Sequence, residues 1–395
     1  MRLEHVDLMG SDFQIQSDMT LEMSGEKISA IGKDIPLVPA DEEIMDLRGL
    51  TLYPGFIDLH VHGAMNEDAS DANVGGLRTI AAYLASKGVT TFCPTTMMIS
   101  REAMGHVFMA AEVFAEQGIC GARMEGLRLE GPFLSEEKCG VQYTEYAEWP
   151  NEDYLKELLK NYPENLVRII DISPELPGAI EFIEALKDKY VFSVAHTAAT
   201  YDQTRRAIQA GARNATHLFN AMNPLHHHEP GAVGAFLSDT KTTCELICDG
   251  KHVHPVVLNL ALKLLGEDRT VVVSDSMRAA GMPDGEYDLG GRKIQVRSGT
   301  TDMGDGRLAG STTNIYVEFL NLLRIGVPLP FAIKACSLNP AKVLKIDHLT
   351  GSIEVDKYAD LIAMDNRFHI RKVWVRGTLV YDSEKSLAVG KGPVQ

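Results

Sequence analysis

The sequence contains no uninterrupted apolar run approaching the roughly 18 residues that a transmembrane helix needs. Residues 1–13 carry charges from the start and lack the apolar segment of a secretory signal peptide. No fixed-period repeat and no low-complexity tract interrupts the chain. We therefore expect a soluble protein of the cytoplasm that has no membrane partner.

Positive charge is also scarce. The chain has 38 lysines and arginines against 54 aspartates and glutamates, a formal net charge of −16. This balance argues against a nucleic-acid partner, because binding a phosphate backbone depends on clustered cations. A small anionic substrate is not excluded, since local charge governs a pocket. The six cysteines match no zinc-ribbon or small-disulfide spacing, and we interpret them as reduced, mostly buried thiols.

Both ends of the chain are rich in predicted strands. Residues 12–35 alternate polar and apolar positions around a turn at "SGEK", and residues 351–382 do the same around "RG". Neither end is long enough for a substantial core of its own. We predict that residues 1–53 and 345–395 pair into one small β-sandwich domain.

The segment between them, residues 54–344, alternates short apolar runs with helix-like stretches. This alternation indicates parallel βαβ units. Eight runs over this length favour a (β/α)8 TIM-like barrel, with a doubly wound sheet as the alternative. The predicted strands are 55–60, 89–95, 126–130, 167–172, 191–196, 213–217, 243–248 and 270–275.

Five of these eight strands end in side chains that can bind a metal ion. In "DLHVHG" two histidines are separated by one residue, so they share a face of the strand. In a barrel all strand ends open onto one face, where residues distant in sequence converge. Each residue alone has an ordinary explanation, such as packing, an ion pair or an N-cap. Together they predict a site for one or two divalent cations. The six residues are His60, His62, Glu130, His196, His217 and Asp275.

Several motifs extend this pattern along nearly the whole chain. They include "PGFIDLHVHG", "LEGPF", "AHTAAT", "THLFNAM", "EPGAVGA", "DGKHVHP", "SDSMRAAGMPDG" and "LAGST". In order and spacing they resemble the N-acetylglucosamine-6-phosphate deacetylases of the amidohydrolase superfamily. "LEGPF" and "THLFNAM" together are specific to this family, whereas His-X-His alone indicates only the superfamily.

The resemblance assigns roles to the predicted metal ligands. It implies a main metal site on Glu130, His196 and His217, and a second position on His60 and His62 that Asp275 can reach. Asp275 matches the catalytic aspartate, which would take a proton from water and give it to the departing amine. The ion itself stays open among Zn, Fe(II), Co and Mn. The family also implies a homodimer.

The resemblance further implies a set of substrate contacts to an amino-sugar phosphate. These are Val141, Gln142, Asn220, Ala221, His228, His252, Leu308, Ala309 and Gly310. Two of them depart from the family pattern. His228 stands where an arginine usually binds phosphate, and Gln142 stands where many relatives have histidine. Within "HHH" at 226–228 we interpret only His228 as a substrate contact and the other two as a solvated loop; a metal tract is the rival interpretation.

The leading hypothesis is therefore metal-dependent hydrolysis of the N-acetyl group of N-acetylglucosamine 6-phosphate, which gives glucosamine 6-phosphate and acetate. The alternative keeps the chemistry but changes the substrate to N-acetylgalactosamine 6-phosphate, or to an unphosphorylated N-acetyl sugar or amino acid. A non-catalytic relative is disfavoured, because it would have a broken ligand set. The missing arginine leaves open whether the 6-phosphate is required.

Overall fold

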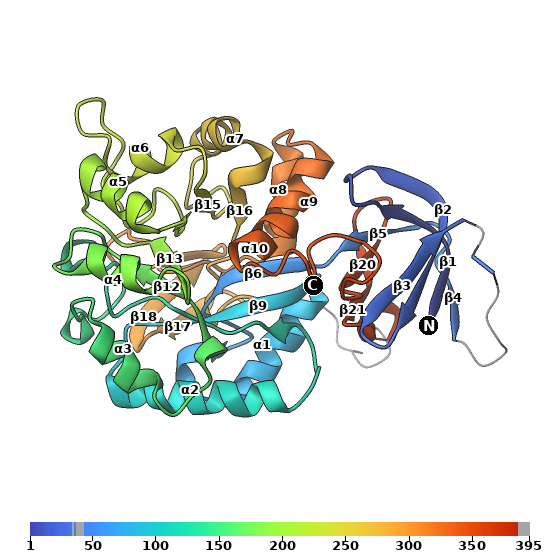
Figure 1. Ribbon diagram of the computed structural model, residues 1–395, viewed down its shortest axis with the longest axis horizontal. Helices are drawn as coiled ribbons and strands as arrows, with labels where there is room; N and C mark the ends of the chain where they lie inside the picture. The colour runs from blue at the N-terminus through green and yellow to red at the C-terminus, as the bar shows by residue number, and fades with distance from the viewer. Residues whose placement is uncertain (34, 37–42, 386–395) are drawn as a thin grey trace.

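The computed structural model describes residues 1–33, 35–36 and 43–385 of the chain. It consists of a large helix-covered barrel and a smaller sheet beside it (Figure 1). Strands from both chain ends, blue and red in Figure 1, meet in the smaller sheet. Among the described residues no helix is long and apolar enough to cross a membrane. The cytoplasmic location stays a prediction.

The barrel is built from eight parallel strands, each hydrogen-bonded to its neighbours. In order around it they are β6 (Phe56–Val61), β9 (Val89–Thr96), β11 (Leu127–Leu129), β12 (Val167–Ile172), β13 (Val191–Val194), β14 (Asn214–Ala215), β15 (Thr243–Leu246) and β16 (Thr270–Val272). The ring closes just beyond β16, where Val61 bridges Ser276 and the Asp275 amide donates to the His60 carbonyl at 2.9 Å. The predicted barrel is confirmed, and the doubly wound alternative is wrong because an open sheet would not close.

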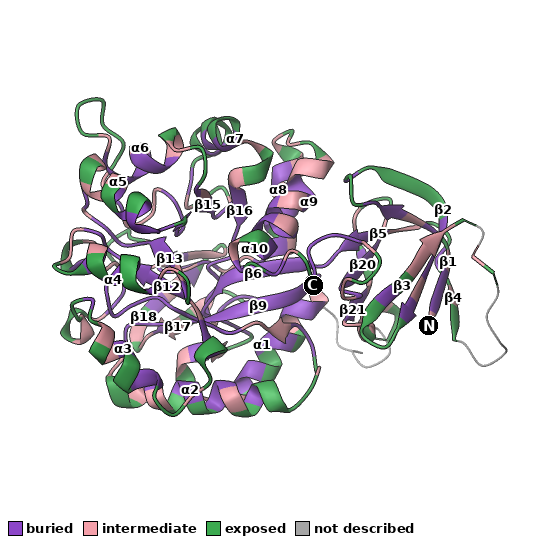
Figure 2. Cartoon of the chain, in the orientation of Figure 1, coloured by how far each residue is buried: buried purple, intermediate pink, exposed green. Residues whose placement is uncertain are grey.

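Helices cover the outside of the barrel, and their buried faces point at the strands (Figure 2). α5 shows why such segments are helical. Thr200 caps its first turn and forms a capping box with Gln203, while Ala207 and Ile208 are buried on one face. The helices are α1 (Val74–Ser86), α2 (Arg101–Glu116), α3 (Glu152–Leu159), α4 (Ala179–Leu186), α5 (Tyr201–Ala210), α6 (Gly231–Ser238), α7 (Pro255–Arg269), α8 (Ile315–Arg324), α9 (Leu329–Cys336) and α10 (Leu338–Val343).

The interior of the barrel is packed with branched aliphatic side chains and with a buried polar network around Arg128. Ile57, Leu59, Ile169, Val271 and Val273 belong to one buried cluster. Every residue of β6 is buried, as expected for a strand covered on both faces. The centre is therefore a packed core, and a functional cavity can open only at its ends.

The smaller sheet joins the two ends of the chain. Its strand order is β22–β21–β20–β5–β1–β2–β3, with β4 paired to β1. Leu52 of β5 lies opposite Ala363 of β20, more than 300 positions away in the sequence. Since β5 ends at Pro54 and β6 begins at Phe56, this sheet is joined directly to the first barrel strand. The strands are β1 (Arg2–Met9), β2 (Ile15–Ser24), β3 (Lys27–Gly32), β4 (Ile44–Asp46), β5 (Leu50–Pro54), β20 (Leu361–Asp365), β21 (Ile370–Val375) and β22 (Thr378–Asp382).

An excursion follows the last barrel strand. It forms a three-stranded antiparallel sheet of β17 (Gly285–Leu289), β18 (Arg292–Arg297) and β19 (Thr300–Asp302). The loop after β19 returns to the barrel at Ser311, whose amide donates to the Asp275 carbonyl at 2.7 Å. The excursion thus lies against the end of the barrel that carries the predicted site. Two short pairs complete the strands, with β7 (Gly63–Ala64) against β8 (Glu67–Asp68) and β10 (Arg123–Met124) beside β9.

Candidate metal centre and active site

All six predicted ligands lie at the carboxyl ends of the barrel strands. His60 is in β6 and His62 follows that strand, while Glu130 follows β11. His196, His217 and Asp275 come two or three residues after β13, β14 and β16. Each of the six is buried. The structure therefore brings together side chains that are up to 215 positions apart in the sequence.

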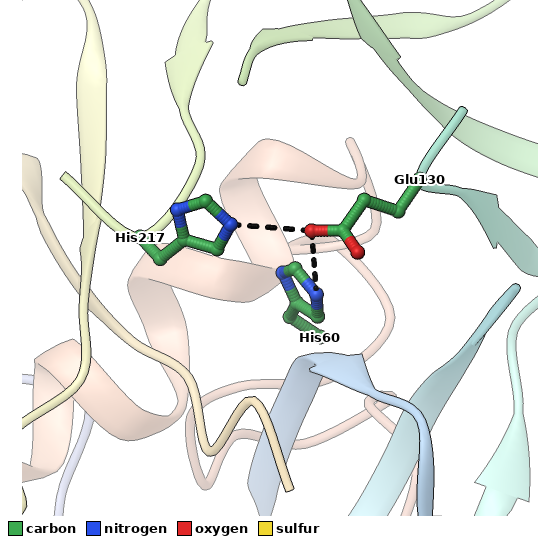
Figure 3. Close-up of side chains that lie close together, drawn as sticks. All are labelled: His60, Glu130 and His217. Carbon is green, nitrogen blue, oxygen red and sulfur yellow. Dashed lines mark hydrogen bonds and ion pairs between the residues drawn. The ribbon is translucent and has the colours of Figure 1, made fainter. Parts of the chain in front are cut away.

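Glu130 is the centre of this cluster. Its Oε1 lies 3.1 Å from His196 Nε2, 3.2 Å from His217 Nε2 and 3.3 Å from His60 Nε2. Figure 3 shows two of these approaches, with His60 and His217 both directed at the same carboxylate. The other oxygen, Oε2, lies 3.3 Å from His62 Nε2. One carboxylate thus contacts all four imidazoles.

Asp275 closes the cluster from the other side. Its Oδ1 lies 3.4 Å from the Nε2 atoms of both His60 and His62. The cluster contains two sets of three potential ligands. Within each set the ligand atoms all lie within 4.8 Å of one another, and His60 belongs to both sets. One set is His60, Glu130 and His217; the other is His60, His62 and Asp275.

The backbone at three of these positions is in the left-handed region. The φ angles are 43° at His196, 29° at His217 and 47° at Asp275. Such a conformation costs a non-glycine residue on the order of 1–3 kcal/mol, and it persists where the surrounding structure enforces it. At these three strand ends it turns the chain sharply just as the side chain joins the cluster.

Charge in the cluster is strongly coupled. Burial and the nearby Arg128 cation lower the pKa of His60, but the carboxylates of Glu130 and Asp275 outweigh them and raise it to about 9. Burial likewise acts to raise the pKa of Glu130 and of Asp275, yet the surrounding histidines hold both pKa values below their usual range. Positive charge next to the two carboxylates therefore stabilises their ionised forms.

A divalent cation would supply this positive charge. The converging atoms are imidazole nitrogens and carboxylate oxygens, the donor types that Zn, Fe(II), Co and Mn accept in proteins. Without a cation the crowded rings must hold protons to satisfy the carboxylates, and a bound cation would displace those protons. The donor set thus suits a metal better than it suits a network of hydrogen bonds.

Two of the rings are oriented by backbone carbonyls. His62 Nδ1 lies 3.1 Å from the Thr95 carbonyl oxygen, and His196 Nδ1 lies 2.8 Å from that of Lys138. A ring that donates from Nδ1 presents an unprotonated Nε2, which is the form that binds metal. Both Nε2 atoms point into the cluster.

A cavity of about 360 Å³ opens beside the cluster. His62, Glu130, His196, His217 and Asp275 form part of its wall. Seven of the nine predicted substrate contacts line it as well: Val141, Asn220, Ala221, His252, Leu308, Ala309 and Gly310. The volume suits a small molecule.

Comparison with known proteins identifies the family. Residues 51–380 match the amidohydrolase family. The chain belongs to the amidohydrolase family. Over 96% of its length it is 35% identical to a protein of Vibrio furnissii named N-acetylglucosamine-6-phosphate deacetylase, of which it covers 94%. It is 36% identical over 83% of its length to an N-acetylgalactosamine-6-phosphate deacetylase of Escherichia coli O157:H7, of which it covers 87%.

A solved structure agrees with this assignment. The chain is similar to the N-acetylglucosamine-6-phosphate deacetylase of Pasteurella multocida, with a TM-score of 0.88 and 31% identity. The similarity covers 96% of this chain and 98% of the other. The resemblance inferred from the motifs is confirmed. This amidohydrolase is an enzyme of a family that generally depends on divalent metal ions.

Two predicted substrate contacts lie elsewhere in this amidohydrolase. Gln142 is buried outside the cavity wall, where its Nε2 donates to Glu130 Oε2 at 2.7 Å and its Oε1 accepts from the Met98 amide at 2.6 Å. Both ends of the amide are engaged, so it orients Glu130. His228 is exposed on a loop outside this chain's cavity. The adjacent rings of His226 and His227 stack with it, away from the metal ligands.

The amidohydrolase cavity also contains two cations that the sequence did not single out. Lys138 and Arg307 line its wall; Lys138 ends the short 3-10 helix Glu136–Lys138, and Arg307 lies in the loop after β19. His252 is the third basic group, and its Nδ1 lies 2.8 Å from Asp249 Oδ2. Its Nε2 is buried without a hydrogen-bond partner among the described residues. These three groups can face an anion.

Proposed function

We propose that this amidohydrolase removes the acetyl group from N-acetylglucosamine 6-phosphate, giving glucosamine 6-phosphate and acetate. The observation that carries the proposal is the convergence of four histidines and two carboxylates in one buried cluster, five of whose six members line the cavity. Similarity to N-acetylglucosamine-6-phosphate deacetylases over nearly the whole chain supports the same reaction.

Within this proposal Glu130, His196 and His217 hold one divalent ion, while His60 and His62 hold a second that Asp275 reaches. When bound, such an ion lowers the pKa of water toward 7 and polarises a carbonyl oxygen. Its identity, among Zn, Fe(II), Co and Mn, can be read by elemental analysis of the purified protein.

Asp275 then acts as general base and general acid. Its carboxylate takes a proton from the water that attacks the acetyl carbon, and it passes that proton to the amine nitrogen as the C–N bond breaks. A protonated amine is a far better leaving group than an amide anion. The neighbouring histidines hold the pKa of Asp275 low, so the side chain begins the cycle as a carboxylate.

The rest of the cavity holds the sugar. Asn220, Ala221, Val141 and the segment 308–310 lie along its wall, within one small volume shared with the metal ligands. We assign the phosphate to Lys138, Arg307 and His252, the basic groups of that wall. A protonated His252 can pair with Asp249 through Nδ1 and offer Nε2–H to an anion. His228 lies outside this chain's cavity and does not serve it directly.

Acetate release tests the proposal. The metal-replete protein is assayed with N-acetylglucosamine 6-phosphate and with unphosphorylated N-acetylglucosamine side by side. We expect a preference of at least about 100-fold for the phosphorylated sugar, about 2.7 kcal/mol of transition-state stabilisation. Equal rates would reject phosphate recognition, and no release from either sugar would reject the deacetylase.

N-acetylgalactosamine 6-phosphate is the second candidate substrate. A relative named for this substrate is as similar to the chain as those named for the glucosamine epimer. The two sugars differ in the orientation of one hydroxyl group, so both can present the same acetyl and phosphate groups. Including this sugar in the same assay ranks the two epimers by kcat/KM.

We also propose a homodimer. α7 exposes an apolar stripe, since Val256, Leu260 and Leu264 share one helix face and each is more than half exposed. His228, outside its own chain's cavity, is free to contact a partner copy. Light scattering should report twice the monomer mass, and Leu260→Asp should reduce it. A monomer in the unmodified protein would reject the dimer.

Finally, we propose that residues 1–53 with 345–395 form a scaffold unit and that 54–344 form the catalytic unit. Pairing of strands from both chain ends in one sheet supports this division. Residues 34, 37–42 and 386–395 of the scaffold unit lie outside the described residues.

A further inference from the structure

Glu245 is a fully buried carboxylate on β15, beneath the metal centre. Two donors hold one of its oxygens: Arg128 Nη1 and Asn214 Nδ2 donate to Oε1 at 2.7 and 2.6 Å. Among the residues that the structure describes, the other oxygen, Oε2, has no hydrogen-bond partner. It faces His60 Nδ1 at 3.8 Å, and in the described part of the chain that nitrogen has no hydrogen-bond partner either.

Two unpaired buried polar atoms that face one another are an unusual arrangement. A buried polar group without a hydrogen bond destabilises the fold, and a shift of less than 1 Å would join this pair in a hydrogen bond. His62 and His196 show what such a bond does, since each has an acceptor at Nδ1 and directs Nε2 into the cluster. For His60 the acceptor in the corresponding place is a carboxylate.

We propose that Glu245 is the positioning residue for His60. In the metal-loaded enzyme its Oε2 accepts the Nδ1 proton of His60, which keeps Nε2 unprotonated and aimed at the second ion. The inference rests on the proposed function to the extent that His60 is taken as a ligand. A carboxylate behind a ligating histidine fixes the ring and increases its basicity.

The surroundings of Glu245 make it a rigid support. Arg128 spans the barrel centre, where its Nε and Nη2 also donate to the two oxygens of Asp171 at 2.9 Å. Its Nη1 reaches the Leu59 carbonyl at 3.1 Å, next to His60. One arginine against two carboxylates leaves one formal negative charge below the cluster. In the dry interior that charge favours a cation above it.

Glu245→Gln tests the proposal because the two donors fix which way a glutamine must point. Arg128 and Asn214 require an oxygen at the Oε1 position, so the amide NH2 must face His60. That NH2 donates to Nδ1, and the His60 ring then carries its proton on Nε2, where the ion should bind. We expect the second ion to bind about 10–100-fold more weakly, with the first ion retained.

The readout is metal binding. Metal-free protein is titrated with Zn²⁺ and with Co²⁺ by calorimetry, and the bound metal is counted by elemental analysis. Glu318→Gln is the control, because Glu318 is another fully buried acidic side chain whose Oε1 has no hydrogen-bond partner among the described residues, while its Oε2 accepts from the Cys248 amide. We expect this control to bind both ions as the unmodified protein does.

Each outcome decides a separate question. Two ions bound with unchanged affinity in Glu245→Gln would overturn the positioning role. A single ion in the unmodified protein would overturn the second metal position itself, and with it this role. Equal weakening of both ions would also overturn the proposal, because a merely structural residue acts on the whole cluster.

Glu245→Asp keeps the inference testable if the glutamine variant does not fold. Aspartate retains the charge that Arg128 requires but withdraws the carboxylate from His60. It should weaken the second ion in the same direction and leave the first unchanged. In a His60→Ala background, neither change at Glu245 should weaken metal binding further.

Discussion

The metal cluster and the opposite cavity wall are built in different ways. The cluster side chains project from strand ends and are at most 11% exposed, and backbone carbonyls orient two of the histidines. On the wall, the side chain of Lys138 is 23% exposed and that of Arg307 is 59% exposed, and both come from segments outside the barrel strands. In the proposed function the chemistry therefore depends on the rigid barrel, whereas recognition of the sugar depends on segments that can vary in sequence without disturbing the metal cluster.

The largest effect is expected within the rigid cluster. Asp275→Asn keeps the shape of the side chain but cannot accept or return a proton. We expect kcat to fall by about 10²–10⁴-fold, with KM much less affected. Elemental analysis should still find metal on Glu130, His196 and His217. Retained turnover in this variant would remove Asp275 from the mechanism.

In the metal-free protein, the stability of the fold should depend on pH through the metal cluster. The pKa of His60 is raised to about 9 from an ordinary value of 6.5, so its protonated form stabilises the fold. That stabilisation is complete below pH 6.5 and is lost as the pH rises through 9. It is on the order of 3 kcal/mol.

Thermal unfolding of chelator-treated protein measures this effect. We expect the melting temperature to fall between pH 6.5 and 9, and added Zn²⁺ to restore it increasingly as the pH rises. His60→Ala should flatten the pH dependence of the metal-free protein. An equally steep fall in that variant would show that another group is responsible.

Removal of one ligand should remove one metal ion from the cluster and leave the other bound. His60→Ala should lower the metal content from two ions to one, because Glu130, His196 and His217 remain. His226→Ala is the control, since this histidine lies on the exposed loop and contacts no ligand. An unchanged count of two ions in His60→Ala would place the second ion elsewhere.

The same contrast explains how far the sequence could predict the structure. Apolar runs of strand length mark the barrel strands, so the residues that end them could be found and brought together by topology alone. Even β14, a two-residue strand in a segment of weak propensity, was placed correctly because its neighbours fix the alternation. A charged residue inside an apolar strand is a sequence signal for a buried polar contact. Arg128 and Glu245 both show this signal, but the sequence analysis did not use it.

The cavity wall left no comparable signal. Lys138 lies near the site because its backbone carbonyl contacts His196 Nδ1. Arg307 lies near it because Thr301 Oγ1 donates to the Gly310 carbonyl at 2.8 Å and so folds the loop back. Such long-range contacts have no period in the sequence. The side chain of Gln142 lies between the Met98 amide and Glu130. Its position in the family motif could not reveal these two contacts, and its role as a substrate contact stays a prediction.

The smallest expected effect belongs to that wall. Arg307→Gln removes a cation from the cavity while leaving the metal cluster intact. Because Arg307 is more than half exposed, water screens its interaction with phosphate. We therefore expect only about a 10-fold loss in kcat/KM for N-acetylglucosamine 6-phosphate.

The loss should appear in KM and should be absent for the unphosphorylated sugar, since Arg307 would contact only the phosphate. Arg206→Gln is the matched control, because Arg206 is exposed on α5 and does not line the cavity. Equal losses on both sugars would mean that Arg307 shapes the wall rather than binding phosphate. If Arg307→Gln loses no activity on either sugar, we would assign phosphate binding to Lys138 and His252, whose side chains are less exposed than that of Arg307.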